Sequence, residues 1–159
     1  MSEAPSFVGR IVGIYVAPEA GKPMEERADA RAVAGRGLEG DRYGHRAGTY
    51  SGRKDETRAV TLIEREAVEA VRREYATELH EWQTRRNLVT EGVPLNHLVG
   101  REFTVGAVRM RGYKLSEPCS YLEELTRPGV RKALVHRGGL RAEVLSSGPI
   151  RLGDPVRPA

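Results

Sequence analysis

The chain has 159 residues and carries 26 Lys or Arg against 22 Asp or Glu, which gives a formal net charge of +4. This length predicts a single domain over residues 1–159, with a flexible start at residues 1–6. No apolar run approaches the ~20 residues that cross a bilayer, so no membrane partner is expected. The single cysteine excludes an internal disulfide, and the N-terminus has no signal-peptide pattern, so a cytoplasmic location is expected.

The first part of the chain predicts short strands around a glycine-rich loop. Residues 7–16 are rich in β-branched side chains and alternate in polarity, as a strand does, and residues 31–34 and 58–63 are further strand candidates. Residues 17–30 predict a polar loop. Residues 35–52 hold six glycines, which is too many for a regular element, so a loop with a demanding backbone path is expected there.

One amphipathic helix is predicted at residues 64–80. Its apolar stripe consists of Ala67, Val68, Val71, Tyr75 and Leu79. The remaining strand candidates are residues 86–89, a hairpin of residues 103–105 and 108–110, and two closing strands at residues 139–145 and 149–156. Many short strands with one long helix predict a mainly β fold with accessory helices, built as a barrel or a sandwich.

Cys119 follows the turn Ser116-Glu117-Pro118 and precedes a short amphipathic segment, residues 121–125. A lone cysteine is either a buried small hydrophobic residue, a surface thiol or a reactive thiolate. Pro118 suits the first turn of a helix, and the unpaired amides at a helix N-terminus stabilise a thiolate. The local sequence leaves the buried and the reactive alternatives evenly balanced.

Several other motifs exclude common types of site. Gly35–Gly40 matches the dinucleotide pattern G-x-G-x-x-G, but residues 41–52 are too rich in glycine to form the helix that this pattern needs. No two histidines have i+3 or i+4 spacing and no Cys-x-x-Cys is present, so no zinc site is expected. His45 and His136 lie close to glycines, and each remains open between a surface position and a functional site. Gly-x-Ser-x-Gly is absent, so a serine hydrolase is not indicated.

Arg85 and Arg86 stand at the start of an apolar strand, where adjacent side chains point to opposite faces. One of them is therefore expected to point inward, where its charge needs an anion or a carboxylate. An internal salt bridge, with Glu39 or Asp41, and an anion-binding role are equally open.

Several segments, read in order, resemble a stand-alone MOSC domain, the C-terminal domain family of molybdenum cofactor sulfurases. The matching segments are residues 37–43, 86–96, 98–106, 118–119, 136–145 and 150–156. The similarity covers about residues 12–156, which are expected to form the domain core. It implies a MOSC-type β-barrel, similar to the PK β-barrel, that binds molybdenum cofactor, a pterin with a dithiolene and a phosphate.

The resemblance also implies roles for individual residues. The family cysteine corresponds to Cys119, which would be the molybdenum ligand and the catalytic residue, and the family Arg-Asn pair corresponds to Arg86 and Asn87. Thiolate is a soft donor that suits molybdenum. The cofactor phosphate suits arginine and loop amides, so the expected cofactor-binding residues are Arg86, Asn87, Arg42, Asp41, Gly40, His45 and His136.

Two features depart from the common pattern of small family members. The segment of residues 46–57 is long and charged, and Glu117 places a carboxylate two residues before Cys119. A neighbouring negative charge disfavours a free thiolate, whereas a bound metal deprotonates the thiol in any case. Glu117 therefore favours a metal ligand over a free nucleophile.

Three functions are compatible with these features. The first is the catalytic unit of a molybdenum-dependent reductase of N-hydroxylated compounds, with a separate electron-donor protein. The second is a non-catalytic carrier of cofactor or of persulfide sulfur, served by a sulfur-donor protein. The third and least expected is a basic nucleic-acid-binding barrel. Pyridoxal phosphate, which some family members use through a separate domain, is not expected on this chain, because none of its four lysines lies in a recognisable Schiff-base segment.

Overall fold

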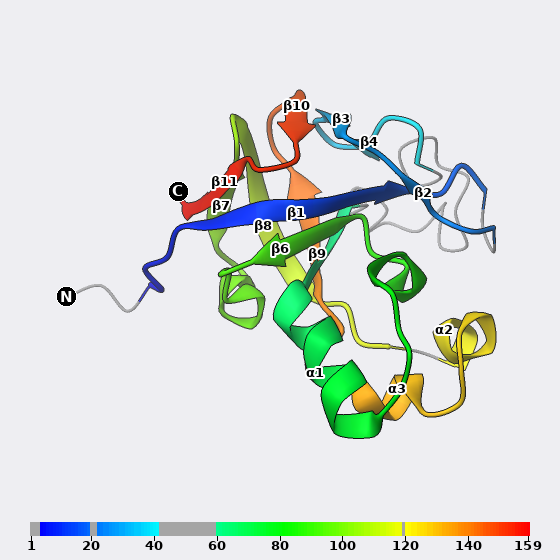
Figure 1. Ribbon diagram of the computed structural model, residues 1–159. Coiled ribbons are helices and arrows are strands. Elements are labelled where there is room, and N and C mark those ends of the chain that lie inside the picture. Colours follow the sequence, from blue (N-terminus) through cyan, green and yellow to red (C-terminus); the bar gives the residue numbers. More distant parts are fainter. Residues whose placement is uncertain (1–3, 20–21, 42–59, 119) are drawn as a thin grey trace.

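The computed structural model describes residues 4–19, 22–41, 60–118 and 120–159, and in this part of the chain strands predominate over helices (Figure 1). The strands are β1 (Gly9–Val16), β2 (Glu25–Glu26), β3 (Asp29–Val33), β4 (Gly37–Leu38), β5 (Val60–Glu64), β6 (Leu88–Glu91), β7 (Glu102–Val105), β8 (Val108–Leu115), β9 (Leu140–Val144), β10 (Gly148–Arg151) and β11 (Pro155–Pro158). The helices are α1 (Arg65–Tyr75), α2 (Ser120–Leu125) and α3 (Val130–Ala133), with 3₁₀ turns η1 (Glu81–Thr84) and η2 (Leu95–Leu98).

Seven of these strands close into a barrel. They follow one another in the order β11-β7-β8-β9-β5-β6-β1, and β11 also pairs with β1 through Gly9 and Val156, which closes the ring. Only the pair of β5 and β6 is parallel, and α1 lies in the connection between them, because parallel neighbours need a crossover. The predicted mainly β fold with a MOSC-type barrel is confirmed.

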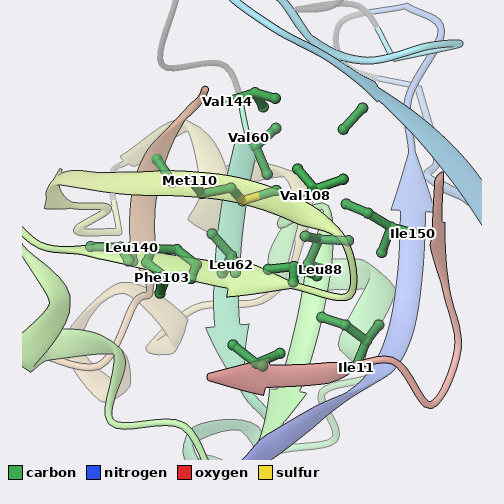
Figure 2. Close-up of a cluster of buried hydrophobic side chains, with 14 of the residues drawn as sticks. Ile11, Val60, Leu62, Leu88, Phe103, Val108, Met110, Leu140, Val144 and Ile150 are labelled. Carbon is green, nitrogen blue, oxygen red and sulfur yellow. The ribbon is translucent and has the colours of Figure 1, made fainter. Parts of the chain in front are cut away.

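The strands that contact the helices contribute to two hydrophobic cores, since successive side chains of a strand point to opposite faces. In β5, Leu62 points into the barrel with Leu88 and Leu140 (Figure 2). The next residue, Ile63, belongs to a second cluster with Val68 of α1. This two-sided burial explains why β5 is apolar over most of its length.

The helices and a small sheet are additions to the barrel. In the view of Figure 1, α1 and α3 lie below the barrel, and the three-stranded sheet β10-β3-β4 lies above it. The helical layer contacts the outward side chains of β1, β5 and β6, which supply Tyr15, Ile63 and Val89 to the second core. No helix in the described part of the chain is long and apolar enough to cross a membrane.

The predicted helix at residues 64–80 is shorter than expected. It ends at Tyr75, and Ala76 adopts the left-handed conformation at φ 48°. The chain then turns back, and Arg72 Nη1 donates a hydrogen bond to the carbonyl oxygen of Leu79 at 2.8 Å. Leu79 lies in this non-helical segment and is fully buried. Its burial extends the apolar pattern beyond the last residue of the helix.

The predicted closing strand at residues 149–156 is two strands. A turn at Gly153, with φ +88°, separates β10 from β11. Strand β10 pairs with β3 and not with β9, whereas β11 closes the barrel. The predicted glycine-rich loop at residues 35–52 contains the two-residue strand β4, and its part from residue 42 onward lies outside the described residues.

Candidate functional site

Asn87 ties three strands together at one end of the barrel. Its Oδ1 accepts hydrogen bonds from the Thr61 backbone N–H (3.1 Å) and hydroxyl (3.3 Å), and its Nδ2 donates to the carbonyl oxygen of Tyr15 at 3.1 Å. The side chain is 3% exposed. These contacts hold β1, β5 and the start of β6 in register and fix the position of the preceding residue, Arg86. The cofactor contact expected for Asn87 stays a prediction.

Arg86 is the inward-pointing arginine of the pair and is 9% exposed. Its Nε donates to the carbonyl oxygen of Gly138 at 2.7 Å, and its Nη2 donates to that of Ser116 at 2.8 Å. Arg85 instead adopts a left-handed conformation at the end of η1, and its Nη1 donates to the carbonyl oxygen of Lys22. The guanidinium of Arg86 therefore joins the loop after β8 to the loop before β9, through backbone carbonyls.

Two glycines allow these loops to approach each other closely. A Cβ atom on Gly138 would lie 2.6 Å from the Ser116 carbonyl oxygen and 2.9 Å from Pro118 Cδ. Gly139 has φ +114°, and a Cβ atom there would overlap the carbonyl oxygen of Leu62. The Ser116 N–H also donates to the carbonyl oxygen of Gly139 at 2.7 Å. The turn that leads to Cys119 is thus packed directly on the glycine pair.

His136 and Glu117 form a further contact between the same two loops. Glu117 Oε1 accepts a hydrogen bond from the His136 backbone N–H at 2.9 Å, and Oε2 lies 3.2 Å from Nδ1 of the imidazole. His136 has φ 64°, a conformation that is uncommon outside glycine, and its carbonyl oxygen accepts a bond from Asn96 Nδ2 at 2.7 Å. The imidazole is 82% exposed. The loop is held on both sides while its ring faces solvent.

The segment Gly40-Asp41 reaches the same end of the barrel from another direction. Asp41 is 1% exposed, and its Oδ1 accepts a hydrogen bond from the Ala17 N–H at 2.9 Å, just beyond the end of β1. Gly40 has φ +88°, which an L side chain rarely adopts. Burial, followed by the charges of nearby glutamates, raises the pKa of Tyr15, so its hydroxyl stays neutral at this end of the barrel.

The structure brings some of the predicted site residues together and leaves others undescribed. The side chain of Arg86 binds the two loops that meet at the turn before Cys119, and His136 lies on one of these loops. Asn87 positions Arg86, and Asp41, next to Gly40, is hydrogen-bonded to Ala17 at the end of β1. Cys119, Arg42 and His45 lie outside the described residues. Pro118 is buried, and α2 begins at Ser120. Among the described residues, no three His, Asp or Glu side chains gather closely enough to hold a metal ion.

Sequence reasoning missed two structural roles in this region. Glu117 was considered only as a neighbour of the thiol, whereas its carboxylate binds His136, nineteen residues later in the chain. The carbonyl partners of Arg86 were also missed, since backbone acceptors leave no sequence signal. The adjacent glycines Gly138 and Gly139 are the sequence feature that could have indicated this close contact.

The sequence model of the MOSC domain matches residues 40–157, which is more than half of the chain. The chain belongs to the MOSC domain family. This family is generally associated with molybdenum cofactor. No curated protein matches the chain.

Solved structures of similar fold agree with this assignment. The YuaD protein from Bacillus subtilis is 16% identical, with a TM-score of 0.77 and 96% of each chain covered. YiiM from Geobacillus stearothermophilus is 19% identical, with a TM-score of 0.69 over 95% of this MOSC chain and 75% of YiiM. YiiM from Escherichia coli is 18% identical, with a TM-score of 0.66 over 94% and 69%. At these identities the likeness establishes the fold alone.

Proposed function

We propose that this MOSC protein binds molybdenum cofactor with Cys119 as the metal ligand, and that it is the catalytic unit of a reductase of N-hydroxylated compounds. The observation that carries the proposal is the bridge from Arg86 to Gly138 and Ser116. It fixes Ser116 and Pro118, just before Cys119, against a glycine pair. Catalytic groups need this kind of support from their surroundings.

The chemistry of the donor set fits the cofactor. The one cysteine of the chain supplies the soft thiolate that molybdenum prefers. The buried guanidinium of Arg86 adds a permanent positive charge beside the same turn, which favours an anionic thiolate and an anionic ligand. Arg42 and His45, with Gly40 and Asp41, would complete the cofactor-binding set.

When bound, the cofactor supplies two-electron redox chemistry. Reduction of an N-hydroxylated compound uses two electrons and two protons and releases water. A single cysteine cannot hold an iron–sulfur cluster, so the electrons would come from a separate donor protein. The residues of this chain would hold and orient the cofactor, and the buried Pro118 and the glycine pair would keep water from one side of the turn.

A sulfur or cofactor carrier is the second candidate. It rests on the single cysteine of the chain, because a persulfide forms on a thiol that is not part of a disulfide. Such a carrier would hold a persulfide on Cys119 and pass its outer sulfur to an acceptor, with a donor protein restoring it.

Metal analysis of the full chain, purified from a host that makes molybdenum cofactor, tests the proposal. Wild-type protein is expected to contain close to one molybdenum per chain, and Cys119→Ser is expected to lose most of it while melting at nearly the same temperature. Mass spectrometry of cofactor-free protein after treatment with a sulfur donor tests the second candidate, because a carrier would hold a persulfide on Cys119. Full molybdenum content in a Cys119→Ser protein of lowered melting temperature would show instead that Cys119 belongs to the core.

A further inference from the structure

The outer face of the barrel strands β11, β7, β8 and β9 is strongly basic. We call this the basic face, and it consists of Arg101, Arg109, Arg111, Lys114, Arg141 and Arg157 with Glu102, Thr104 and Glu143. Its six basic and two acidic side chains leave an excess of four positive charges, as large as that of the whole chain. The charge imbalance of the sequence is therefore concentrated on one surface.

The alternation of β8 creates this face. Val108 and Met110 point into the barrel and are fully buried, whereas Arg109 and Arg111 point outward. Strand register then places outward residues in rows. The rows are Arg157 with Thr104 and Arg109, Glu102 with Arg111 and Glu143, and Lys114 with Arg141.

Glu102 holds two of the arginines in place without covering them. Glu102 contacts Arg111 Nη2 at 2.9 Å and Arg109 Nε at 3.5 Å, and the two arginine side chains remain 50% and 59% exposed. An arginine has five N–H donors, so an ion pair through one nitrogen leaves donors for an external carboxylate. The ion pairs orient both guanidinium groups in advance of binding, which lowers the entropy cost of a partner.

The basic face also contains a hollow of about 490 Å³. The hollow is lined by three arginines, Arg101, Arg109 and Arg111, by one acidic residue, Glu102, and by Pro158 and Ala159 among others. Three arginines against one glutamate leave the hollow positively charged, which suits a carboxylate side chain. Residues that fill such hollows commonly dominate the binding energy of protein interfaces.

The basic face continues to the candidate site. Lys114 and Arg141 are paired across β8 and β9, and the next residues along these strands lead to Ser116 and Gly139. Along β8 the distance from Arg111 to Lys114 is roughly 10 Å. A protein bound over the hollow and extending along β8 would thus reach the loop that contains Ser116.

We propose that the basic face docks an acidic segment of a partner protein, with one carboxylate side chain in the hollow. A protein is favoured over a nucleic acid because Glu102 and Glu143 alternate with the arginines and would repel a continuous row of phosphates. A protein surface can match such a mixed pattern. The docking does not depend on a bound cofactor, so it stands apart from the proposed reductase activity.

Fluorescence anisotropy of the cofactor-free full chain with a labelled oligoglutamate peptide, at low ionic strength, tests the proposal. The combined variant Arg101→Gln, Arg109→Gln and Arg111→Gln is expected to weaken peptide binding about tenfold or more. Backbone amide shifts in NMR spectra should change mainly along β7 and β8 when the peptide is added to wild-type protein.

A matched variant removes the same number of charges elsewhere. Arg31, Arg36 and Arg73 are exposed arginines of β3, of the turn after it and of α1, outside the four strands of the basic face, and their combined replacement by Gln is expected to change peptide affinity less than about twofold. Equal weakening in both variants would mean attraction by net charge alone and would overturn the proposal. So would tighter, steeply salt-dependent binding of a labelled oligothymidylate, which would assign the face to nucleic acid. Circular dichroism verifies that both variants are folded.

Discussion

The guanidinium of Arg86 donates a hydrogen bond to the carbonyl oxygen of Ser116 at 2.8 Å, three residues before Cys119. The same side chain binds Gly138 on the other loop. A single buried cation thus determines how two distant segments meet. Its structural role and its proposed cofactor-binding role can be separated, because only the second depends on a ligand.

Replacing Arg86 by Ala is expected to destabilise the cofactor-free protein by roughly 3 kcal/mol or more, because two hydrogen bonds from a charged donor are lost and two carbonyls are left in a buried site. Arg86→Lys keeps the charge but not the planar fork, so its loss should be smaller. Urea unfolding measures both. Arg36→Ala, a change at an exposed arginine in a turn, serves as the control and should alter stability by less than about 0.5 kcal/mol.

Molybdenum content of the Arg86 variants then decides the second role. Should Arg86 also support the phosphate, retention at a temperature where all variants are folded would decrease from wild type to Lys to Ala. Unchanged retention with lowered stability would restrict Arg86 to its role in joining the loops, and Arg42 with the glycine-rich loop would have to bind the anion.

The close approach at Gly139 makes a second prediction. Gly139→Ala introduces a Cβ atom onto the carbonyl oxygen of Leu62 at a backbone φ of +114°, so a loss of more than about 3 kcal/mol is expected. Gly35 also has a positive φ, +75°, but a Cβ atom there would meet nothing within 4 Å. Gly35→Ala should therefore cost only about 1–2 kcal/mol, the conformational penalty alone. Similar losses in the two variants, measured by urea unfolding, would contradict the packing argument.

The sequence predicted the fold class because strand alternation and apolar runs are local signals. The prediction of individual elements failed where a side chain is buried by segments that lie far away in the chain. Leu79 extended the helical pattern although it packs from a non-helical segment, and residues 149–156 look like one strand although Gly153 reverses the chain between two different sheets. Local periodicity records that a side chain is buried, but not which element buries it.

The candidate site was predicted less completely. Alternation predicts that one of Arg85 and Arg86 points inward, and in the structure Arg86 is the buried one. Its partners do not follow, because Ser116 and Gly138 lie 30 and 52 residues away and contribute backbone oxygens that any residue type supplies. The contact of Glu117 with His136 likewise depends on the barrel topology, which places the end of β8 beside the start of β9.

Asn87 provides a third prediction. Asn87→Asp keeps the shape but replaces the amide donor to the Tyr15 carbonyl with a carboxylate oxygen, in a position that is 3% exposed. A loss of roughly 2–4 kcal/mol near neutral pH is expected from the missing hydrogen bond and the buried charge. The same change at the exposed Asn96 should cost less than about 1 kcal/mol. Thermal unfolding distinguishes the two variants, and equal shifts in Tm would mean that Asn87 does not join the strands as described.

The pH dependence of stability provides the last prediction, through two glutamates with opposite shifts. Burial, with a smaller contribution from Glu66, raises the pKa of Glu64 above its ordinary value of 4.5. The folded state therefore binds this proton more tightly than the unfolded state, and the protein loses stability as the pH rises through the folded pKa. Glu64→Gln removes that loss. Its urea midpoint should exceed that of wild type at about pH 7 and approach it below about pH 4.

Glu91 should behave in the opposite way. A hydrogen bond from Arg10, with Arg65 on its other oxygen, lowers the pKa of Glu91, so its contribution is present above the unfolded pKa and is lost as the pH falls through the folded pKa. Glu91→Gln should therefore be less stable than wild type at about pH 7, and the two should converge in acid. Urea midpoints measured from about pH 3 to pH 8 give both curves.

A Glu64→Gln curve that lies below wild type at neutral pH would contradict the prediction for Glu64. It would mean that the carboxylate of Glu64 stabilises the start of α1 by more than its burial costs.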